Sequence, residues 1–291
     1  MIASSDPIDV DDVAGHYNDL DRFYREIWGD HVHHGFWVTG QESPVQATEN
    51  LVDLVATNLQ LQNEQSVLDI GCGYGATAKK LSQDYGVSVV GVTVSESQYE
   101  YASQSVADLP LVSVLSQDIL RNGFDSEAFD RVLSIECISH VVDKQKFIAE
   151  VTRVLRPGGR AVIIAWLVGE SPSDDEIKRL LEPICREGRL PSMASESEYR
   201  EMIASSSLEL ESFEDLTQRV AKTWRICLRR LAGALLVKPS YWRFLASRES
   251  RHSVFLFTLL RILRAYRCGA MRYGMFVITK PDQDELASDS D

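Results

Sequence analysis

A glutamate and a histidine, four residues apart, follow a short apolar segment with the composition of a buried strand. Glu136 and His140 come directly after residues 131–135. Ligands of open α/β sheets bind where strands end, and histidine is the side chain best suited to accept a proton near neutral pH. We predict that His140 is a catalytic base and that Glu136 orients it or binds the acceptor. The alternative is a structural histidine in a strand–helix loop.

Residues 67–75 read Val-Leu-Asp-Ile-Gly-Cys-Gly-Tyr-Gly, an apolar strand that runs into a glycine-rich turn. Glycine permits positive φ and close approach of a ligand to the backbone. A dinucleotide-binding turn has its third glycine one residue later and an acidic residue about twenty positions further on, where this chain has Val92 and Thr93. Asp69 would repel a pyrophosphate but suits a cationic ligand with an amino group. The turn therefore favours S-adenosylmethionine over a dinucleotide or a turn without a ligand.

Short β-branched segments alternate with amphipathic ones, which is typical of a parallel sheet with helices on both faces. Pro44 suits a first helical turn, and the Pro-Gly-Gly of 157–159 suits a helix end. Strands are predicted at 66–70, 87–92, 111–114, 131–135, 160–166, 208–213 and 273–279, and helices at 44–59, 76–85, 96–107 and 144–155.

Several stretches resemble one group of enzymes. Residues 67–75 are similar to the first motif of class I S-adenosylmethionine-dependent methyltransferases. Residues 23–37 (FYREIWGDHVHHGFW) and 136–144 (ECISHVVDK) resemble the gamma-tocopherol methyltransferase group, and 91–98 (GVTVSESQ) resembles that group and the cyclopropane-fatty-acid synthases. With the RVLRPGG of 153–159, the resemblance covers roughly residues 15–215. It implies an α/β fold, a Rossmann-like doubly wound seven-stranded mostly parallel sheet with a helical lid.

The resemblance also implies roles for individual residues. The enzyme would methylate a small, lipophilic phenol, quinol or prenyl-type acceptor, with S-adenosyl-L-methionine as donor and S-adenosyl-L-homocysteine as product. His140, with Glu136, would act at the acceptor. The implied cofactor-binding residues are Asp69, Gly71 and Gly73 at the methionine moiety, Thr93 and Gln98 at the ribose, Asp118 and Ile119 at the adenine, and Tyr17 and His34 closing over the cofactor. Structural roles as a cap, a solvated helix residue and a turn residue remain open for Asp69, Gln98 and Asp118.

Charge is spread unevenly along the 291 residues, whose net charge is −13. Residues 219–272 contain 13 of the 30 Lys and Arg residues and one acid, Glu249, and so carry +12. The segment also contains apolar clusters and four aromatic residues, Trp224, Trp242, Phe244 and Tyr266. We predict a basic helical cap that contacts an anionic membrane surface, binds a prenyl chain with a phosphate or phenol head, or pairs with the acidic remainder. No nucleic-acid partner is predicted, because the rest of the chain is acidic and no Asn-Pro-Pro-aromatic run is present.

The chain divides into a helical cofactor-covering segment (1–60), a cofactor-binding core (61–166), lid helices with the sixth strand (167–272), a last strand returning to the core (273–281) and an acidic tail (282–291). The polar ends, 1–12 and 282–291, are predicted to be frayed. Five scattered cysteines without a Cys-x-x-Cys pair and a start without an apolar stretch favour reduced thiols and a cytoplasmic protein, with peripheral membrane contact left open.

His31, His33 and His34 lack helical spacing and a cysteine partner, so no metal site is predicted. A methyl transfer to the nitrogen of a small amine, a nucleotide-dependent oxidoreductase and a non-catalytic binding protein remain as alternatives. The fold alone does not identify an acceptor.

Overall fold

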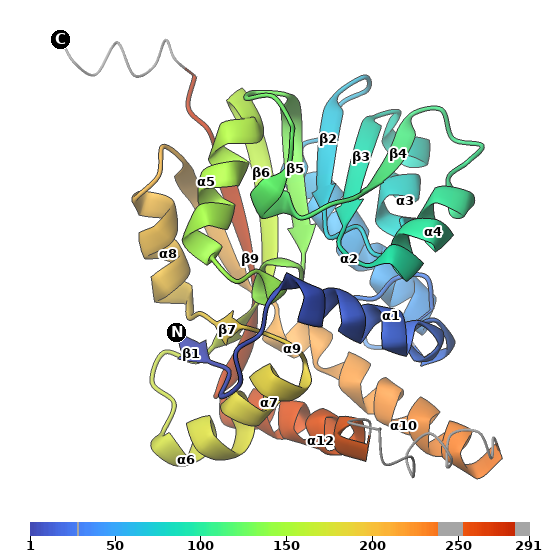
Figure 1. Cartoon of the computed structure of the whole chain (residues 1–291), viewed down its shortest axis with the longest axis vertical. Coiled ribbons are helices and arrows are strands. Elements are labelled where there is room, and N and C mark those ends of the chain that lie inside the picture. Colours follow the sequence, from blue (N-terminus) through green and yellow to red (C-terminus); the bar gives the residue numbers. More distant parts are fainter. Residues whose placement is uncertain (28, 238–252, 283–291) are drawn as a thin grey trace.

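A seven-stranded sheet forms the centre of the computed structural model, which describes residues 1–27, 29–237 and 253–282 (Figure 1). The strand order is β4-β3-β2-β5-β6-β9-β8, and β9 alone runs antiparallel to its neighbours among these described strands. The strands are β2 (Ser66–Ile70), β3 (Ser88–Thr93), β4 (Val112–Ser116), β5 (Phe129–Ile135), β6 (Leu155–Val168), β8 (Glu209–Asp215) and β9 (Met271–Thr279). The predicted mostly parallel, doubly wound sheet is confirmed.

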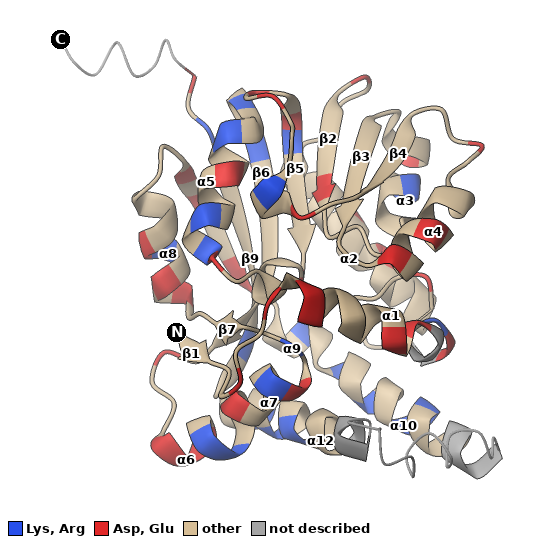
Figure 2. Cartoon of the chain, in the orientation of Figure 1, with Lys and Arg blue, Asp and Glu red and all other residues tan. Residues whose placement is uncertain are grey.

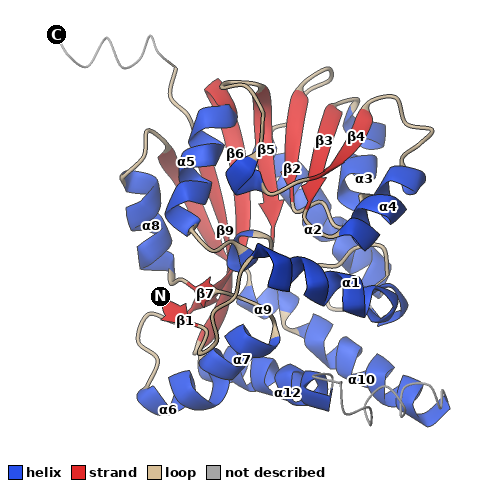
Figure 3. Ribbon diagram, in the orientation of Figure 1, coloured by secondary structure: helices blue, strands red, loops and turns tan. Residues whose placement is uncertain are grey.

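Helices cover both faces of this sheet (Figure 3). They are α2 (Pro44–Leu59), α3 (Ala76–Tyr85), α4 (Glu96–Ser105), α5 (Lys144–Val154) and α8 (Glu196–Ala204). Successive strand residues point to opposite faces, so Val67 lies in the same buried cluster as Leu51 of α2, while Leu68 lies in a second cluster with Phe147 of α5. Both faces are therefore buried, as the continuous apolar strands require.

Local signals explain the boundaries that the sequence predicts correctly. Ser43 caps α2 in a reciprocal capping box with Gln46, and Pro44 occupies the first turn. Gly86 ends α3 in the left-handed conformation, with φ of 67°. The bounds of α2, β2 and α3 match the predicted ones, whereas β6 is longer at both ends, because it pairs with β5 from Leu155 and with β9 as far as Val168.

The N-terminus is ordered, so the prediction of frayed residues 1–12 is wrong. The two-residue strand β1 (Ile2–Ala3) pairs antiparallel with β7 (Ser192–Met193), and α1 (Val10–Ile27) begins soon afterwards. At the other end of the chain, residues 283–291 of the predicted tail lie outside the described residues.

The remaining helices gather at the carboxyl ends of the parallel strands, where α1 also lies (Figure 1). They are α6 (Asp174–Glu176), the π-helical turn η3 (Ile177–Leu181), α7 (Glu182–Glu187), α9 (Thr217–Val220), α10 (Lys222–Val237) and α12 (Ser253–Cys268). Two 3₁₀ turns, η1 (Ile119–Arg121) and η2 (Ile138–His140), follow β4 and β5. Trp242 and Phe244 of the predicted cap lie outside the described residues.

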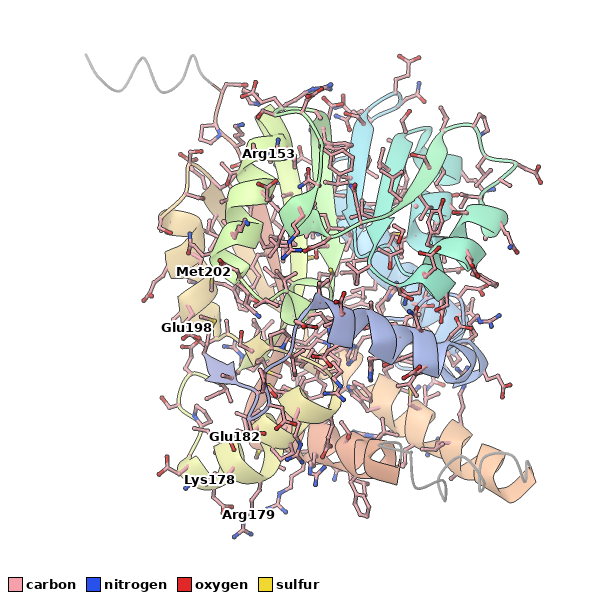
Figure 4. All side chains as sticks on the ribbon, in the orientation of Figure 1. Arg153, Lys178, Arg179, Glu182, Glu198 and Met202 are labelled. Atoms are coloured by element: carbon pink, nitrogen blue, oxygen red, sulfur yellow. The ribbon has the colours of Figure 1, made fainter. Side chains whose placement is uncertain are left out.

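Charge is distributed unevenly among the helices. Lys and Arg residues run along α10, whereas acidic residues mark α1 and α4 (Figure 2). Lys178, Arg179 and Glu182 lie at the lid end, far from Arg153 at the opposite end (Figure 4). No helix among the described residues is long and apolar enough to span a membrane.

Candidate active site

One cavity lies where the parallel strands end, enclosed by α1 and the lid helices. Its empty volume is about 1530 Å³, part of it open to solvent. Strand ends and their loops supply one wall, α1 supplies residues such as Tyr17 and Tyr24, and α7, α10 and α12 supply Ile184, Trp224 and Ile262. This position agrees with the rule that open α/β sheets bind ligands at their carboxyl edge.

The glycine-rich turn after β2 forms one end of the cavity. Gly71 has φ of 82°, and a Cβ atom there would lie 2.4 Å from the Cβ atom of Cys137, so protein packing requires the glycine. Gly73 has φ of 54°, yet a Cβ atom there would meet nothing within 4 Å. Because Gly73 lines the cavity, its missing side chain leaves room for a ligand against the backbone.

Asp69 lies just behind this turn and does not line the cavity. Its side chain is 2% exposed and its Oδ2 atom has no hydrogen-bond partner among the described residues. Burial raises the pKa of Asp69 to about 7. A buried carboxyl group without a donor is costly when ionised, so a nearby cationic ligand would stabilise it.

The ends of β3 and β4 supply amide and carboxylate groups. The Thr93 hydroxyl donates to Gln98 Oε1 at 2.8 Å, which holds the amide in place. Asp118 Oδ1 accepts from the Leu120 backbone N–H at 2.9 Å, so this residue caps η1 as well as lining the cavity. Gln117 also lines the cavity, and its buried Nε2 atom has no partner among the described residues.

Asn18 anchors α1 across the cofactor end of the cavity. Its Oδ1 atom accepts from Ser95 Oγ at 2.8 Å and from Ser97 Oγ at 3.0 Å, at the start of α4. One turn further along, the Tyr74 hydroxyl donates to Asp21 Oδ1 at 2.8 Å. These contacts position the neighbouring Tyr17 over the cavity.

His140 is held by hydrogen bonds at both ring nitrogens. Its Nδ1 atom lies 3.1 Å from the carbonyl oxygen of Arg189, which can only accept, so Nδ1 carries the proton. The unprotonated Nε2 atom therefore accepts from the Tyr17 hydroxyl at 2.9 Å. The tautomer thus directs the basic nitrogen of His140 toward Tyr17.

The ring of His140 is neutral near neutral pH. Burial, assisted by the nearby charge of Lys144, lowers the pKa of His140 to about 4. Lys144 is itself buried, and its Nζ atom donates to the Val141 carbonyl at 3.1 Å and to Ser192 Oγ at 2.9 Å. It thereby ties the η2 turn to the segment that contains Arg189. Burial lowers the pKa of Lys144 to about 8.

Glu136 does not orient His140, which corrects that part of the prediction. Its Oε1 atom accepts from the His34 backbone N–H at 2.7 Å, from His34 Nδ1 at 2.8 Å and from the Tyr273 hydroxyl at 2.7 Å. Its Oε2 atom accepts from Trp166 Nε1 at 2.8 Å. His34 and these hydrogen bonds outweigh the desolvation of the carboxyl group and hold the pKa of Glu136 at about 2.

The Glu136 carboxylate therefore joins three distant segments. His34 follows α1, Trp166 lies near the end of β6 and Tyr273 lies near the start of β9. The His34 ring also packs edge-on against Trp166 and Trp224. Glu136 itself has φ of 64°, an uncommon conformation for a residue other than glycine. The saturated carboxylate supports the cavity wall rather than offering a free base.

The structure brings ten of the eleven predicted site residues to the cavity and leaves Asp69 behind its wall. Sequence reasoning did not assign a role to Gln117, Trp166 or the Arg189 carbonyl. Its position directly before the predicted residue Asp118 is the sequence signal that could have identified Gln117. Trp166 and Arg189 carried no such signal, since their partners lie far away in the sequence.

The histidine run forms hydrogen bonds within itself. His33 Nδ1 donates to the His34 carbonyl at 2.9 Å, and His33 Nε2 lies 3.1 Å from His31 Nδ1. Burial lowers the pKa of His31 to about 3. Within the described residues, no group of three His, Cys, Asp or Glu side chains is arranged to hold a metal ion.

The residues at the end of the cavity beside the glycine turn fit S-adenosylmethionine. The unpaired Asp69 carboxyl group suits the positive charge of the methionine moiety, Gly73 leaves space for it, and the unpaired Gln117 amide can donate to a purine nitrogen. When bound, this cofactor supplies an electrophilic methyl group on a sulfonium sulfur.

Comparisons with known proteins agree with this assignment. The family described as mycolic acid cyclopropane synthetase matches residues 5–235. The chain is 29% identical over 294 residues to a chloroplastic tocopherol O-methyltransferase of Arabidopsis thaliana, covering 92% of this chain and 82% of the relative. It is 32% identical over 212 residues to 27-O-demethylrifamycin SV methyltransferase of Amycolatopsis mediterranei, covering 72% of this chain and 77% of the relative.

A solved structure shares the fold. The cyclopropane synthase MmaA2 from Mycobacterium tuberculosis superposes with a TM-score of 0.83 at 22% identity, covering 95% of this chain and 100% of that chain.

Proposed function

The chain belongs to the mycolic acid cyclopropane synthetase family and is an S-adenosylmethionine-dependent methyltransferase, and we propose that it methylates an uncharged, lipophilic acceptor through a hydroxyl group. The observation that carries this proposal is the composition of the cavity wall. None of the described residues that line the cavity is Lys or Arg, and most are apolar or aromatic.

The acceptor end of the cavity is apolar on several sides. α12 contributes Leu259 and Ile262, the segment around α7 contributes Ile184 and Leu190, and Trp224 comes from α10. Such a surface gains free energy by covering hydrocarbon. A lipophilic body of the acceptor therefore fits this end of the cavity.

The charged groups that line the cavity disfavour an anionic head group. Asp118, Glu136 and Glu187 are all acidic. Arg261 of α12, a lid cation beside this wall, is already paired, because its guanidinium contacts both carboxylate oxygens of the lining residue Glu187 at 2.5 and 2.6 Å. Among the described lining residues a diphosphate would find no counter-charge, and burial of an uncompensated anion is strongly unfavourable. These observations support a phenol rather than a phosphate as the head group of the proposed acceptor.

The geometry supports the following role for each residue of the site. Asp69, Gly71, Gly73, Thr93, Gln98, Gln117, Asp118 and Ile119 position the cofactor. His140 is the final acceptor of the proton, and Tyr17 lies between His140 and the methyl acceptor. Glu136 and His34 stabilise the cavity wall. Alignment of acceptor, methyl group and sulfur supplies most of the rate enhancement.

The test is a methyl-transfer assay with labelled S-adenosylmethionine and matched acceptors. γ-Tocopherol and 1-naphthol are uncharged phenols of different length, and geranyl diphosphate is a prenyl compound with an anionic head. We expect turnover of at least one phenol and none of geranyl diphosphate. Faster turnover of geranyl diphosphate than of both phenols would contradict the proposal.

Methyl transfer to a small amine is the second candidate, favoured by the acidic residues of the cavity wall. A protonated amine would be attracted to Glu136, but that carboxylate already accepts four hydrogen bonds. Dodecylamine in the same assay distinguishes the two candidates, since preferential turnover of this amine over the phenols would support the second.

A further inference from the structure

His140 has no vacant position for an acceptor. Its Nδ1–H donates to the Arg189 carbonyl, and its Nε2 lone pair accepts from Tyr17. An imidazole ring has only these two hydrogen-bonding positions. An acceptor hydroxyl can reach Nε2 only by displacing Tyr17 or by acting through it.

The Tyr17 oxygen retains one vacant position. It donates its proton to His140 and accepts no hydrogen bond from any described residue. Tyr17 also lines the cavity, so its free lone pair is available to a hydroxyl group of a bound acceptor. Burial raises the pKa of Tyr17 well above its usual value, which keeps the phenol protonated and able to donate.

Tyr17 is also held firmly from both sides. Asn18, the next residue, is fixed to the start of α4, and the Tyr17 ring packs 5.4 Å from the His140 ring and 5.3 Å from the Tyr24 ring, measured between centroids. Displacing it would break its hydrogen bond to His140 and disturb the packing of α1. A route through the Tyr17 hydroxyl requires neither.

We propose that Tyr17 is a catalytic residue that relays the acceptor proton to His140. The proposal rests on the proposed function. The acceptor hydroxyl gives its proton to the Tyr17 oxygen while the Tyr17 proton passes to His140 Nε2. The acceptor oxygen forms a bond to the methyl carbon as the carbon–sulfur bond breaks, and that electron pair stays on sulfur. The products are the methyl ether, neutral S-adenosylhomocysteine and protonated His140, so atoms and charge balance.

Because the proton is relayed through two side chains, both the Tyr17 hydroxyl and the His140 ring must be present. Removing either the Tyr17 hydroxyl or the His140 ring interrupts the same path, and removing both adds little more. Residues that act as one unit characteristically show such non-additive losses. If Tyr17 instead blocked the base, its removal would free Nε2 and increase the rate.

The kinetic test compares Tyr17→Phe, His140→Ala and the double variant with the fastest phenol among γ-tocopherol and 1-naphthol. We expect Tyr17→Phe to lower kcat by roughly 10²–10⁴, to leave the affinity for S-adenosylhomocysteine within a few-fold of wild type, and to match both His140→Ala and the double variant. Tyr101→Phe is the matched control, because the Tyr101 hydroxyl donates to Asp30 at 3.2 Å outside the cavity. This control should behave like wild type.

Two results would overturn the relay. One is an unchanged or increased kcat in Tyr17→Phe while His140→Ala is impaired, which would leave the proposed function intact. The other is an equal loss in cofactor affinity and kcat, which would make Tyr17 a cofactor-positioning residue. No turnover of any phenol by wild type would instead contradict the proposed function.

A structure with S-adenosylhomocysteine and 1-naphthol tests the relay without turnover. We expect the naphthol oxygen within hydrogen-bond distance of the Tyr17 oxygen, with the Tyr17–His140 bond retained. A naphthol oxygen bound to His140 Nε2, with Tyr17 displaced, would refute the relay.

Discussion

The ionisation of one carboxyl group, that of Asp69, should make cofactor binding depend on pH. Its pKa is about 7 in the free protein because it is buried without a donor. A cofactor ammonium favours the ionised form, so below pH 7 binding must first remove a proton from Asp69. The affinity for S-adenosylhomocysteine should then be roughly tenfold weaker at pH 6 than at pH 8. Calorimetry at the two pH values measures this change.

Asp69→Asn is the matching control for this linkage. The amide has a similar shape and does not titrate, so its affinity should be weaker overall and independent of pH between 6 and 8. A wild-type affinity that is also flat over this range would show that Asp69 is not coupled to the cofactor.

The pKa of His140 determines the acid limb of the pH profile. A base must be neutral to accept a proton, and His140 remains neutral down to about pH 4. With S-adenosylmethionine at saturation, kcat/KM for the phenol should therefore stay level from pH 8 to about 5.5, where an ordinary histidine with a pKa near 6.5 would already have lost most of its activity.

Burial is the larger cause of this low pKa, and Lys144→Met tests the part that the Lys144 charge contributes. Removing the buried charge beside η2 should raise the pKa of His140 and move the acid limb to higher pH. Glu136, the other charged group that acts on His140, has the opposite effect and remains in place. Lys146→Met, on the exposed side of the same helix, should leave the profile unchanged. A wild-type limb near pH 6.5 would contradict the assignment.

In the turn between β2 and α3, two glycines are required for different reasons: Gly71 for packing and Gly73 for ligand space. Gly73→Ala points a methyl group into the cavity, so we expect weaker binding of S-adenosylhomocysteine with only a small loss of stability. Gly71→Ala drives a methyl group into Cys137, so we expect a lower Tm as its main effect. Thermal unfolding and calorimetry on both variants would check this contrast. Equal effects on binding and stability in the two variants would contradict it.

Local signals predict the elements well, whereas contacts between distant segments escape sequence reasoning. The capping box at Ser43 and the glycine-rich turn place α2, β2 and α3 correctly, because each signal lies beside the element that it ends. The strand at Ile2 is missed, since its partner Met193 lies far along the chain. The role of Glu136 is misjudged for the same reason: four donors from distant segments saturate it.

At the scale of the whole molecule, the basic lid has two faces with different surroundings. Leu259 and Ile262 of α12 line the cavity, whereas Phe257 and Leu260 on the outer side are 58% and 47% exposed. Arg264 and Arg267 continue the outer stripe at helical spacing and are exposed. Some lid cations do pair with acids, as in the contact of Arg272 with Asp215 and Glu196. Ion pairs and an exposed stripe of apolar and basic residues therefore coexist in the described part of the lid.

Flotation with lipid vesicles tests whether this exposed stripe binds a membrane. We expect the protein to bind vesicles rich in phosphatidylglycerol more than vesicles of phosphatidylcholine, and to detach as salt is added, because apolar and basic residues act together at an anionic interface. Leu260→Ser should weaken this binding without altering activity on 1-naphthol in solution. Equal binding to both vesicle types at low salt would leave pairing within the protein as the role of the lid charge.

Base catalysis at His140 is the central claim, and single-turnover methyl transfer by His140→Ala measures it directly. With an uncharged phenol as acceptor, we expect the rate of the variant to fall by roughly 10²–10⁴ while its affinity for S-adenosylhomocysteine stays close to that of wild type. A loss of only a few-fold in a variant that still binds the cofactor would contradict the claim.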